Sequence, residues 1–138
     1  MLGIDAGERR VGLALSDESR LLASPLIVLD RRGGLSRVLD AIAALTAREQ
    51  VRQVVVGLPL NADGSAGPQA QRAERFAGLV ERATGLPVQM WDERLSTHAA
   101  EAVLRAQGRS TRRARARGQI DAVAAAVILQ DYLDAVRR

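Results

Sequence analysis

The sequence predicts an α/β fold in which helices flank a mixed five-stranded sheet, an antiparallel meander of three strands plus two parallel strands. Two observations support this prediction. Three short β-rich segments come first, and amphipathic helical patterns then alternate with strands from residue 35 onward. Consecutive meander strands pair antiparallel, whereas a strand–helix–strand unit makes its two strands parallel. A chain of 138 residues has the length of one domain, so we expect residues 1–138 to form a single domain.

The chain begins with two short apolar strands joined by a turn. Residues 2–6 and 10–16 are largely apolar, and Gly7 with its polar neighbours suits the turn of a hairpin. Asp5 is the exception, because it lies inside the first strand with no basic residue beside it. An unpartnered buried carboxylate is costly, so a bound divalent cation would compensate it. Alternatively, Asp5 is a turn residue that hydrogen-bonds the backbone after Gly7, and the hairpin alone favours neither interpretation.

The next elements complete the meander and begin the alternating part of the chain. Residues 21–29 form a third β-rich segment, and Pro25 within it favours an edge position or a bulge. Apolar side chains at helical spacing predict a helix over residues 35–49. Three consecutive valines predict that residues 53–57 form a strand covered on both faces.

The second half of the chain continues this alternation. A loop rich in turn-forming residues occupies positions 58–68. After it we expect a helix at 68–84, a strand at 87–91, a helix from Ser96 or Thr97 to Gly108, and a last helix at 118–136. The inner stripe of the last helix is expected at Ile120, Val123, Ala124, Val127 and Ile128.

Composition argues against several kinds of chemistry. The chain has no cysteine, which excludes disulfides, thiol catalysis and thiolate metal sites. Its single histidine, His98, argues against a zinc site or a Ser-His-Asp triad. No apolar run approaches the roughly 20 residues that span a bilayer, and the N-terminus enters a strand without a signal peptide. We therefore expect a cytoplasmic protein with no membrane partner.

Positive charge is concentrated in one segment. The formal net charge is +4, from 20 basic and 16 acidic residues. Between residues 102 and 120 there are arginines and no acid, namely Arg105, Arg109, Arg112, Arg113, Arg115 and Arg117. Without these residues the acids outnumber the bases. Such a segment is the footprint of a contact with a phosphate backbone, although a solvated loop without a partner would have the same composition.

Three acidic residues fall where this strand order would bring them together. Asp5 ends the first strand, Glu93 follows the last strand, and Asp121 lies in the first turn of the final helix. Ligands gather at the carboxyl ends of strands in such sheets, and a helix N-terminus favours the ionised form of Asp121. Singly, each acid has a simpler role, because Asp121 can stabilise its helix and Asp92 with Glu93 can form a surface turn paired with Arg94. Together they favour a functional site.

Oxygen ligands without cysteine or histidine suit Mg²⁺ or Mn²⁺. A pair of such ions would activate water and stabilise the leaving oxygen in phosphodiester cleavage. The arginine-rich segment at 109–117 would then hold the polyanion over the metals. We therefore expect a metal-dependent nuclease.

Four sequence blocks carry a resemblance to a known family. They are residues 3–7 with 10–14 (GIDAG and RVGLA), 56–65 (VGLPLNADGS), 91–97 (WDERLST) and 121–125 (DAVAA). In this order they resemble the YqgF/RuvX family, RNase H-like proteins described as Holliday junction resolvases and as pre-16S rRNA processing nucleases. The resemblance implies an RNase H-like sheet.

The resemblance also implies roles for individual residues. It implies Asp5, Glu93 and Asp121 as catalytic, metal-binding acids. With the basic residues noted above, the expected nucleic-acid-binding set is Arg10, Asn61, Arg94, Thr97, Arg109, Arg112, Arg113, Arg115 and Arg117. Glu8 departs from the family pattern, which has a small hydroxyl residue there, and an extra acid near Asp5 could weaken polyanion approach or alter metal preference.

Several functions compete on this sequence. Structured RNA is favoured as substrate, in 5′-end maturation of pre-16S rRNA and ribosome biogenesis, on the family resemblance alone. The alternative is a Holliday junction resolvase acting on DNA, which needs two active sites and therefore a homodimer rather than a monomer. A nucleic-acid or ribosome-binding module without catalysis is the non-enzymatic alternative. An actin-like or sugar-kinase domain begins with a similar hairpin, but it needs a second domain to close over ATP.

Overall fold

A mixed five-stranded sheet forms the centre of the molecule. The computed structural model describes residues 1–95 and 120–137. Its strands are β1 (Leu2–Ala6), β2 (Arg10–Ser16), β3 (Ala23–Asp30), β4 (Val54–Leu58) and β5 (Val88–Asp92). They lie in the order β3-β2-β1-β4-β5, with β1, β2 and β3 antiparallel and with β4 parallel to both β1 and β5. The predicted RNase H-like sheet is confirmed.

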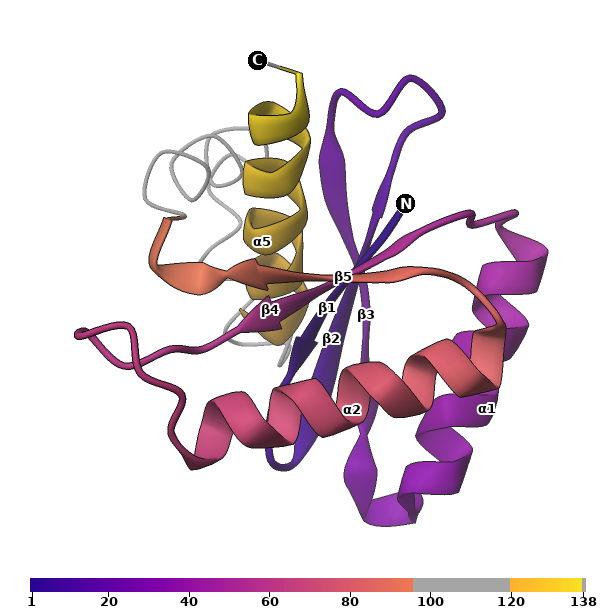
Figure 1. The fold of residues 1–138 in the computed structure, drawn as a ribbon. Coiled ribbons are helices and arrows are strands. Elements are labelled where there is room, and N and C mark those ends of the chain that lie inside the picture. Colours follow the sequence, from indigo (N-terminus) through magenta and orange to yellow (C-terminus); the bar gives the residue numbers. More distant parts are fainter. Residues whose placement is uncertain (96–119, 138) are drawn as a thin grey trace.

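Helices cover both faces of this sheet (Figure 1). The described helices are α1 (Leu35–Arg48), α2 (Pro68–Thr84) and α5 (Ile120–Val136), with two short 3₁₀ helices, η1 (Arg31–Gly33) and η2 (Glu93–Leu95). Helices α1 and α2 pack on one face and α5 on the other. The predicted helix ending at Gly108 and the arginine-rich segment at 109–117 lie outside the described residues. No helix in the described part of the chain has both the length and the apolar character of a membrane span.

Alternation along the central strands separates two apolar cores. Leu2 and Ile4 of β1 are fully buried against the core under α1 and α2. Gly3, between them, faces α5, and the same period of two places Asp5 on the α5 face. On β4, Val55 packs against the α5 core, and Gly57, two residues on, also contacts α5. The α5 face therefore carries the acidic side chain at the end of β1.

Small residues let α5 lie close to β1. A Cβ atom added to Gly3 would be 2.7 Å from Leu129 Cβ and 2.9 Å from the Ala125 carbonyl oxygen, so only glycine fits there. Ala122, Ala125 and Ala126 are also buried, and their small side chains allow this close approach. Helix α5 runs antiparallel to β1. Its later residue Gln130 bonds to Ala23 and Leu21 near the start of β1, whereas its earlier residue Ala125 lies over the middle of that strand.

The predicted inner stripe of α5 is wrong in part. Val123 and Ile128 are buried, but Ala124 and Val127 are only half-buried, and the Ile120 side chain lies outside the described set. The fully buried positions are instead Ala125, Ala126, Leu129 and Leu133. The helix is apolar on nearly every side, so periodicity alone does not identify its inner face.

The third strand begins two residues later than predicted. Leu21 and Leu22 belong to the preceding turn, where their N–H groups donate to the Asp17 carboxylate at 2.8 and 3.2 Å. Pro25 lies in β3 at the edge of the sheet, beside a register shift between Leu13 and Ala14 of β2. The prediction that Pro25 takes an edge position or a bulge is confirmed by its place on the edge strand.

Candidate active site

The carboxyl ends of β1, β4 and β5 converge on one pocket. Asp5 is the fourth residue of β1, and Glu93 follows β5 directly as the first residue of η2. Because β4 lies between β1 and β5, their backbones are two strand spacings apart, about 10 Å. Side chains from β1 and from the end of β5 can meet only if position 57 on β4 leaves the space open.

Gly57 provides that space. A Cβ atom at this position would overlap the Glu93 carboxylate and would lie 2.5 Å from Ile128 Cδ1 of α5. Glu93 therefore reaches across β4 and hydrogen-bonds with Asp5. The structure thus brings together two of the three predicted catalytic acids.

The electrostatics of Glu93 reflect this crowding. Burial raises the pKa of the Glu93 carboxyl to about 7, and the Asp5 charge, the Asp5 hydrogen bond and the Asp92 charge act in the same direction. Two carboxyl groups in contact repel each other when both are ionised. A divalent cation relieves that repulsion and is the partner that such oxygen donors fit.

Asp92 has a different partner. Its carboxylate forms an ion pair with Arg94 at 2.8 Å, and it also accepts the Arg94 backbone N–H at 3.0 Å. These bonds, chiefly the one from the guanidinium, lower the pKa of Asp92. The simpler interpretation, a surface turn paired with Arg94, therefore holds for Asp92, while Glu93 points toward Asp5.

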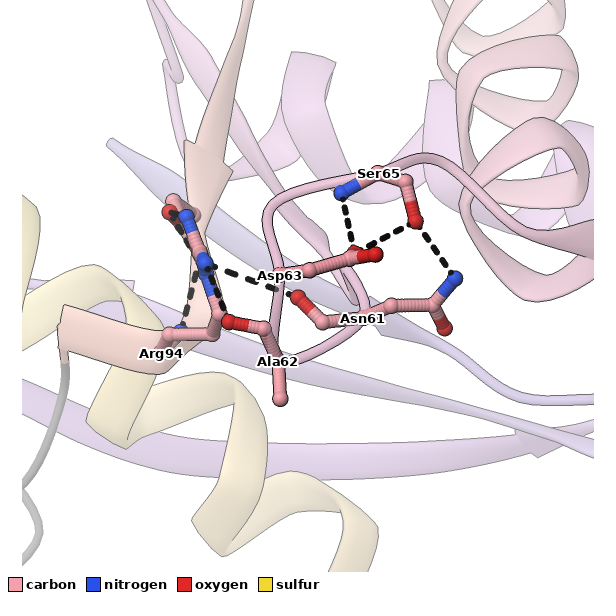
Figure 2. Close-up of polar contacts among 6 residues, drawn as sticks. Asn61, Ala62, Asp63, Ser65 and Arg94 are labelled. Carbon is pink, nitrogen blue, oxygen red and sulfur yellow. Dashed lines mark hydrogen bonds and ion pairs between the residues drawn. The ribbon is translucent and has the colours of Figure 1, made fainter.

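Arg94 also holds the loop that follows β4 (Figure 2). Its Nη1 donates to the carbonyl oxygens of Ala62 at 3.2 Å and Asn61 at 3.5 Å. Within the loop, the Asn61 amide donates to Ser65 Oγ at 2.9 Å, and Ser65 Oγ donates to Asp63 at 2.6 Å. Asn61 and Arg94 thus order this loop beside the site, and their contact with nucleic acid stays a prediction.

The remaining predicted residues lie as follows. Asp121 is the second residue of α5, and the antiparallel course of α5 over β1 places its first turn toward the end of β1 that carries Asp5. The Asp121 side chain is not among those that the structure describes. Among the described residues, no three potential metal ligands form a group. Arg10 is exposed at the start of β2. Thr97 and the predicted arginines at 109–117 lie outside the described residues.

Two residues of α2 complete the pocket and were not predicted. Gln69 and Arg72 line a cavity of about 170 Å³ together with Asp5, Glu8 and Glu93. Arg72 forms an ion pair with Glu8 at 2.9 Å. The sequence does contain a signal for them, because the loop at 58–68 leaves the carboxyl end of β4 and so starts α2 at that end. A larger cavity, of about 710 Å³, lies at the opposite end of the sheet.

The sheet order and the carboxyls at the ends of β1 and β5 define the RNase H-like class. Two solved structures share the fold with TM-scores of 0.60 and 0.59: RuvC of Thermus thermophilus, at 18% identity, and the fowlpox virus resolvase in complex with Holliday junction DNA, at 9%. Each comparison covers 99% of this chain, with 96% of RuvC and 98% of the resolvase. At these identities the likeness concerns the fold alone.

The chain belongs to the RuvX family, whose profile, described as a Holliday junction resolvase, matches residues 1–135. A relative from Anaeromyxobacter sp. (strain Fw109-5) is 53% identical over 135 residues, which is 96% of this chain and 95% of the relative. A relative from Chloroflexus aggregans is 47% identical over 137 residues, covering 99% and 94%. Both carry the provisional name pre-16S rRNA nuclease.

Proposed function

We propose that this protein is a nuclease that hydrolyses phosphodiester bonds of nucleic acid, and that residues 1–138 act as one RNase H-like nuclease domain. The observation that carries the proposal is the meeting of Asp5 and Glu93 across Gly57, in a pocket at the carboxyl ends of the strands. Membership of the RuvX family supports the same activity. Asp121, in the first turn of α5, is the proposed third catalytic acid.

We further propose Mg²⁺ or Mn²⁺ as the cofactor, with two ions held by Asp5, Glu93 and Asp121. The donor set fits, because hard oxygen ligands suit these ions and a cation relieves the repulsion within the Asp5–Glu93 pair. When bound, such ions supply an activated water and stabilise the leaving oxygen. The chain's own part is to hold both carboxyls at one point and to place Arg72 at the rim, where its charge attracts a phosphate.

The proposed substrate is structured RNA, in 5′-end maturation of pre-16S rRNA in the cytoplasm. The provisional name of the close relatives supports this choice. Resolution of DNA junctions is the second candidate, supported by the family description and by the shared fold of the fowlpox resolvase. It requires a symmetric homodimer, since two strands must be cut.

A cleavage assay of one protein preparation on three labelled substrates tests the proposal. The substrates are a precursor 16S rRNA fragment, a linear RNA and a four-way DNA junction. We expect cleavage of the precursor with Mg²⁺ or Mn²⁺ and none with a chelator. Light scattering on the same preparation measures the oligomeric state. If the DNA junction is cleaved, the protein should be a dimer.

Asp5→Asn and Glu93→Gln should each reduce cleavage by at least about 100-fold, because each removes a charged group from the reaction centre. Asp40→Asn, at an exposed position of α1, is the matched control and should cleave like the wild type. An Asp5→Asn protein that cleaves as well as the wild type would refute the role of Asp5. Binding of RNA without cleavage of any substrate would favour the non-enzymatic module.

A further inference from the structure

A second cavity adjoins the candidate active site. It measures about 210 Å³ and is lined by Arg31, Leu35, Arg72, Arg75, Phe76 and Leu79. Arg72 lines both this cavity and the pocket that contains Asp5 and Glu93. The two hollows therefore adjoin at Arg72, and the second hollow, which lies along α2 beside the start of α1, is called the basic groove below.

Arg31, in the basic groove, is held in place by two contacts. Its Nη1 donates to the carbonyl oxygen of Gly7, a residue of the active-site pocket, at 2.9 Å. Its guanidinium also lies over the Phe76 ring, 5.7 Å from the ring centroid. A guanidinium fixed in this way loses less conformational entropy when it binds an anion than a free one would.

Few carboxylates neutralise the positive charge of this groove. Within the described residues, neither Arg31 nor Arg75 forms an ion pair with a carboxylate, and Arg72 pairs with Glu8 alone. The Glu8 side chain is 71% exposed, so this pair is weak and exchangeable. Leu35 and Leu79 form low-dielectric walls, which strengthen the field of the arginines.

We propose that Arg31, Arg72 and Arg75 bind backbone phosphates of the substrate strand beside the bond that is cleaved at Asp5 and Glu93. This inference rests on the proposed nuclease function and deepens it. Guanidinium groups bind phosphates in bidentate geometry, and such contacts position a strand without reading its sequence. The Phe76 ring, only 3% exposed, does not offer a face for base stacking, so charge is the means of recognition in this groove.

A salt titration with a charge-removing variant tests the groove. Binding of a fluorescently labelled RNA stem with a single-stranded flank is measured in chelator at salt concentrations from about 50 to 200 mM. Arg75→Gln should bind several-fold more weakly and should lower the slope of log K against log salt by about 0.7–0.9, the value of one phosphate contact.

The matched control is Arg52→Gln, which removes the same charge from an exposed position at the opposite end of the sheet. It should leave the slope unchanged. A slope for Arg75→Gln equal to that of the wild type would overturn the proposal, as would an equal loss in both variants.

Glu8 provides a second, opposite test. Glu8→Gln frees Arg72 and should tighten RNA binding several-fold. In an Arg72→Gln background the same change should have a clearly smaller effect, because the two residues interact directly. Equal effects in both backgrounds would show that Glu8 acts only through its general charge and would count against Arg72 as a phosphate contact.

The two proposals fail in different ways. If the wild type cleaves RNA but Arg75→Gln retains the full salt slope, the groove is wrong and the nuclease stands. If Arg75→Gln lowers the slope but the wild type cleaves nothing, the nuclease is wrong and the groove stands as a binding surface.

Discussion

Among individual residues, Gly57 does most to shape the site. Its lack of a side chain lets Glu93 cross β4 and reach Asp5. A methyl group at position 57 would displace the Glu93 carboxylate and press on Ile128. The site therefore depends on a residue that takes no part in the chemistry.

Gly57→Ala should lower cleavage by about 100-fold, because a displacement of about 1 Å in a reacting group is enough for such a loss. It should also cost about 1–3 kcal/mol of stability through overpacking. The matched control is Gly78→Ala within α2, where an added Cβ meets no atom within 4 Å. That change should raise stability by about 0.5–1 kcal/mol and leave cleavage intact. Normal cleavage by Gly57→Ala would contradict the described position of Glu93.

Glu93 should also make stability depend on pH when metal is absent. Folding raises the pKa of Glu93 from its ordinary 4.5 to about 7, so the folded chain holds a proton that the unfolded chain releases in this interval. The stabilisation is complete below pH 4.5 and is lost as the pH rises through 7. After allowance for partial exposure we expect a loss of roughly 1–2 kcal/mol.

Urea unfolding in chelator at about pH 5 and pH 7.5 measures this effect. Glu93→Gln should show a smaller loss of stability over the same interval, since its side chain cannot titrate. The aspartates whose pKa is lowered, among them Asp17 and Asp92, stabilise the fold at both of these pH values and lose that contribution only at more acidic pH. Identical pH profiles for wild type and Glu93→Gln would rule out the buried carboxyl pair.

Sequence reasoning found Asp5 and Glu93 but could not predict how they meet. The strand order places both at the same end of the sheet, so their convergence could be predicted. The choice between Asp92 and Glu93 depends on which of them Arg94 pairs with, and this is a tertiary detail. Gly57 gave no signal, because a glycine at the end of a valine-rich strand has many explanations.

At the level of elements, the close contact between α5 and β1 positions the third candidate acid. Asp121 lies in the first turn of α5, and the Gly3 contact with Ala125 and Leu129 determines how closely that helix approaches the sheet. The strands and the first two helices were predicted within a few residues, because their apolar periodicity is clear. The inner face of α5 was not, because nearly all of its sides are apolar.

Gly3→Ala should move α5 away from the sheet. The added methyl would lie 2.7 Å from Leu129 Cβ and 2.9 Å from a backbone oxygen, which cannot rotate away. We expect a loss of about 1–3 kcal/mol in urea unfolding, together with reduced cleavage through a displaced Asp121. A variant as stable as the wild type would show that α5 does not pack this closely.

For the whole molecule, the described structure places a basic groove beside the candidate active-site pocket. The pocket lies where the order β3-β2-β1-β4-β5 brings the carboxyl ends of β1 and β5 to either side of β4. The groove arises from arginines on η1 and α2, which are far apart in sequence, so composition could not reveal it. The concentration of arginines at 109–117, in contrast, is evident from the sequence alone, and its role in binding stays a prediction.

The most direct test of the account is a calorimetric titration of Mn²⁺ into chelator-free protein. The wild type should bind Mn²⁺ and release protons near pH 7, because Glu93 must ionise to become a ligand. The double variant Asp5→Asn/Glu93→Gln, shown to be folded by circular dichroism, should bind at least about tenfold more weakly. Equal affinity and equal proton release in the two proteins would contradict a cation site at Asp5 and Glu93.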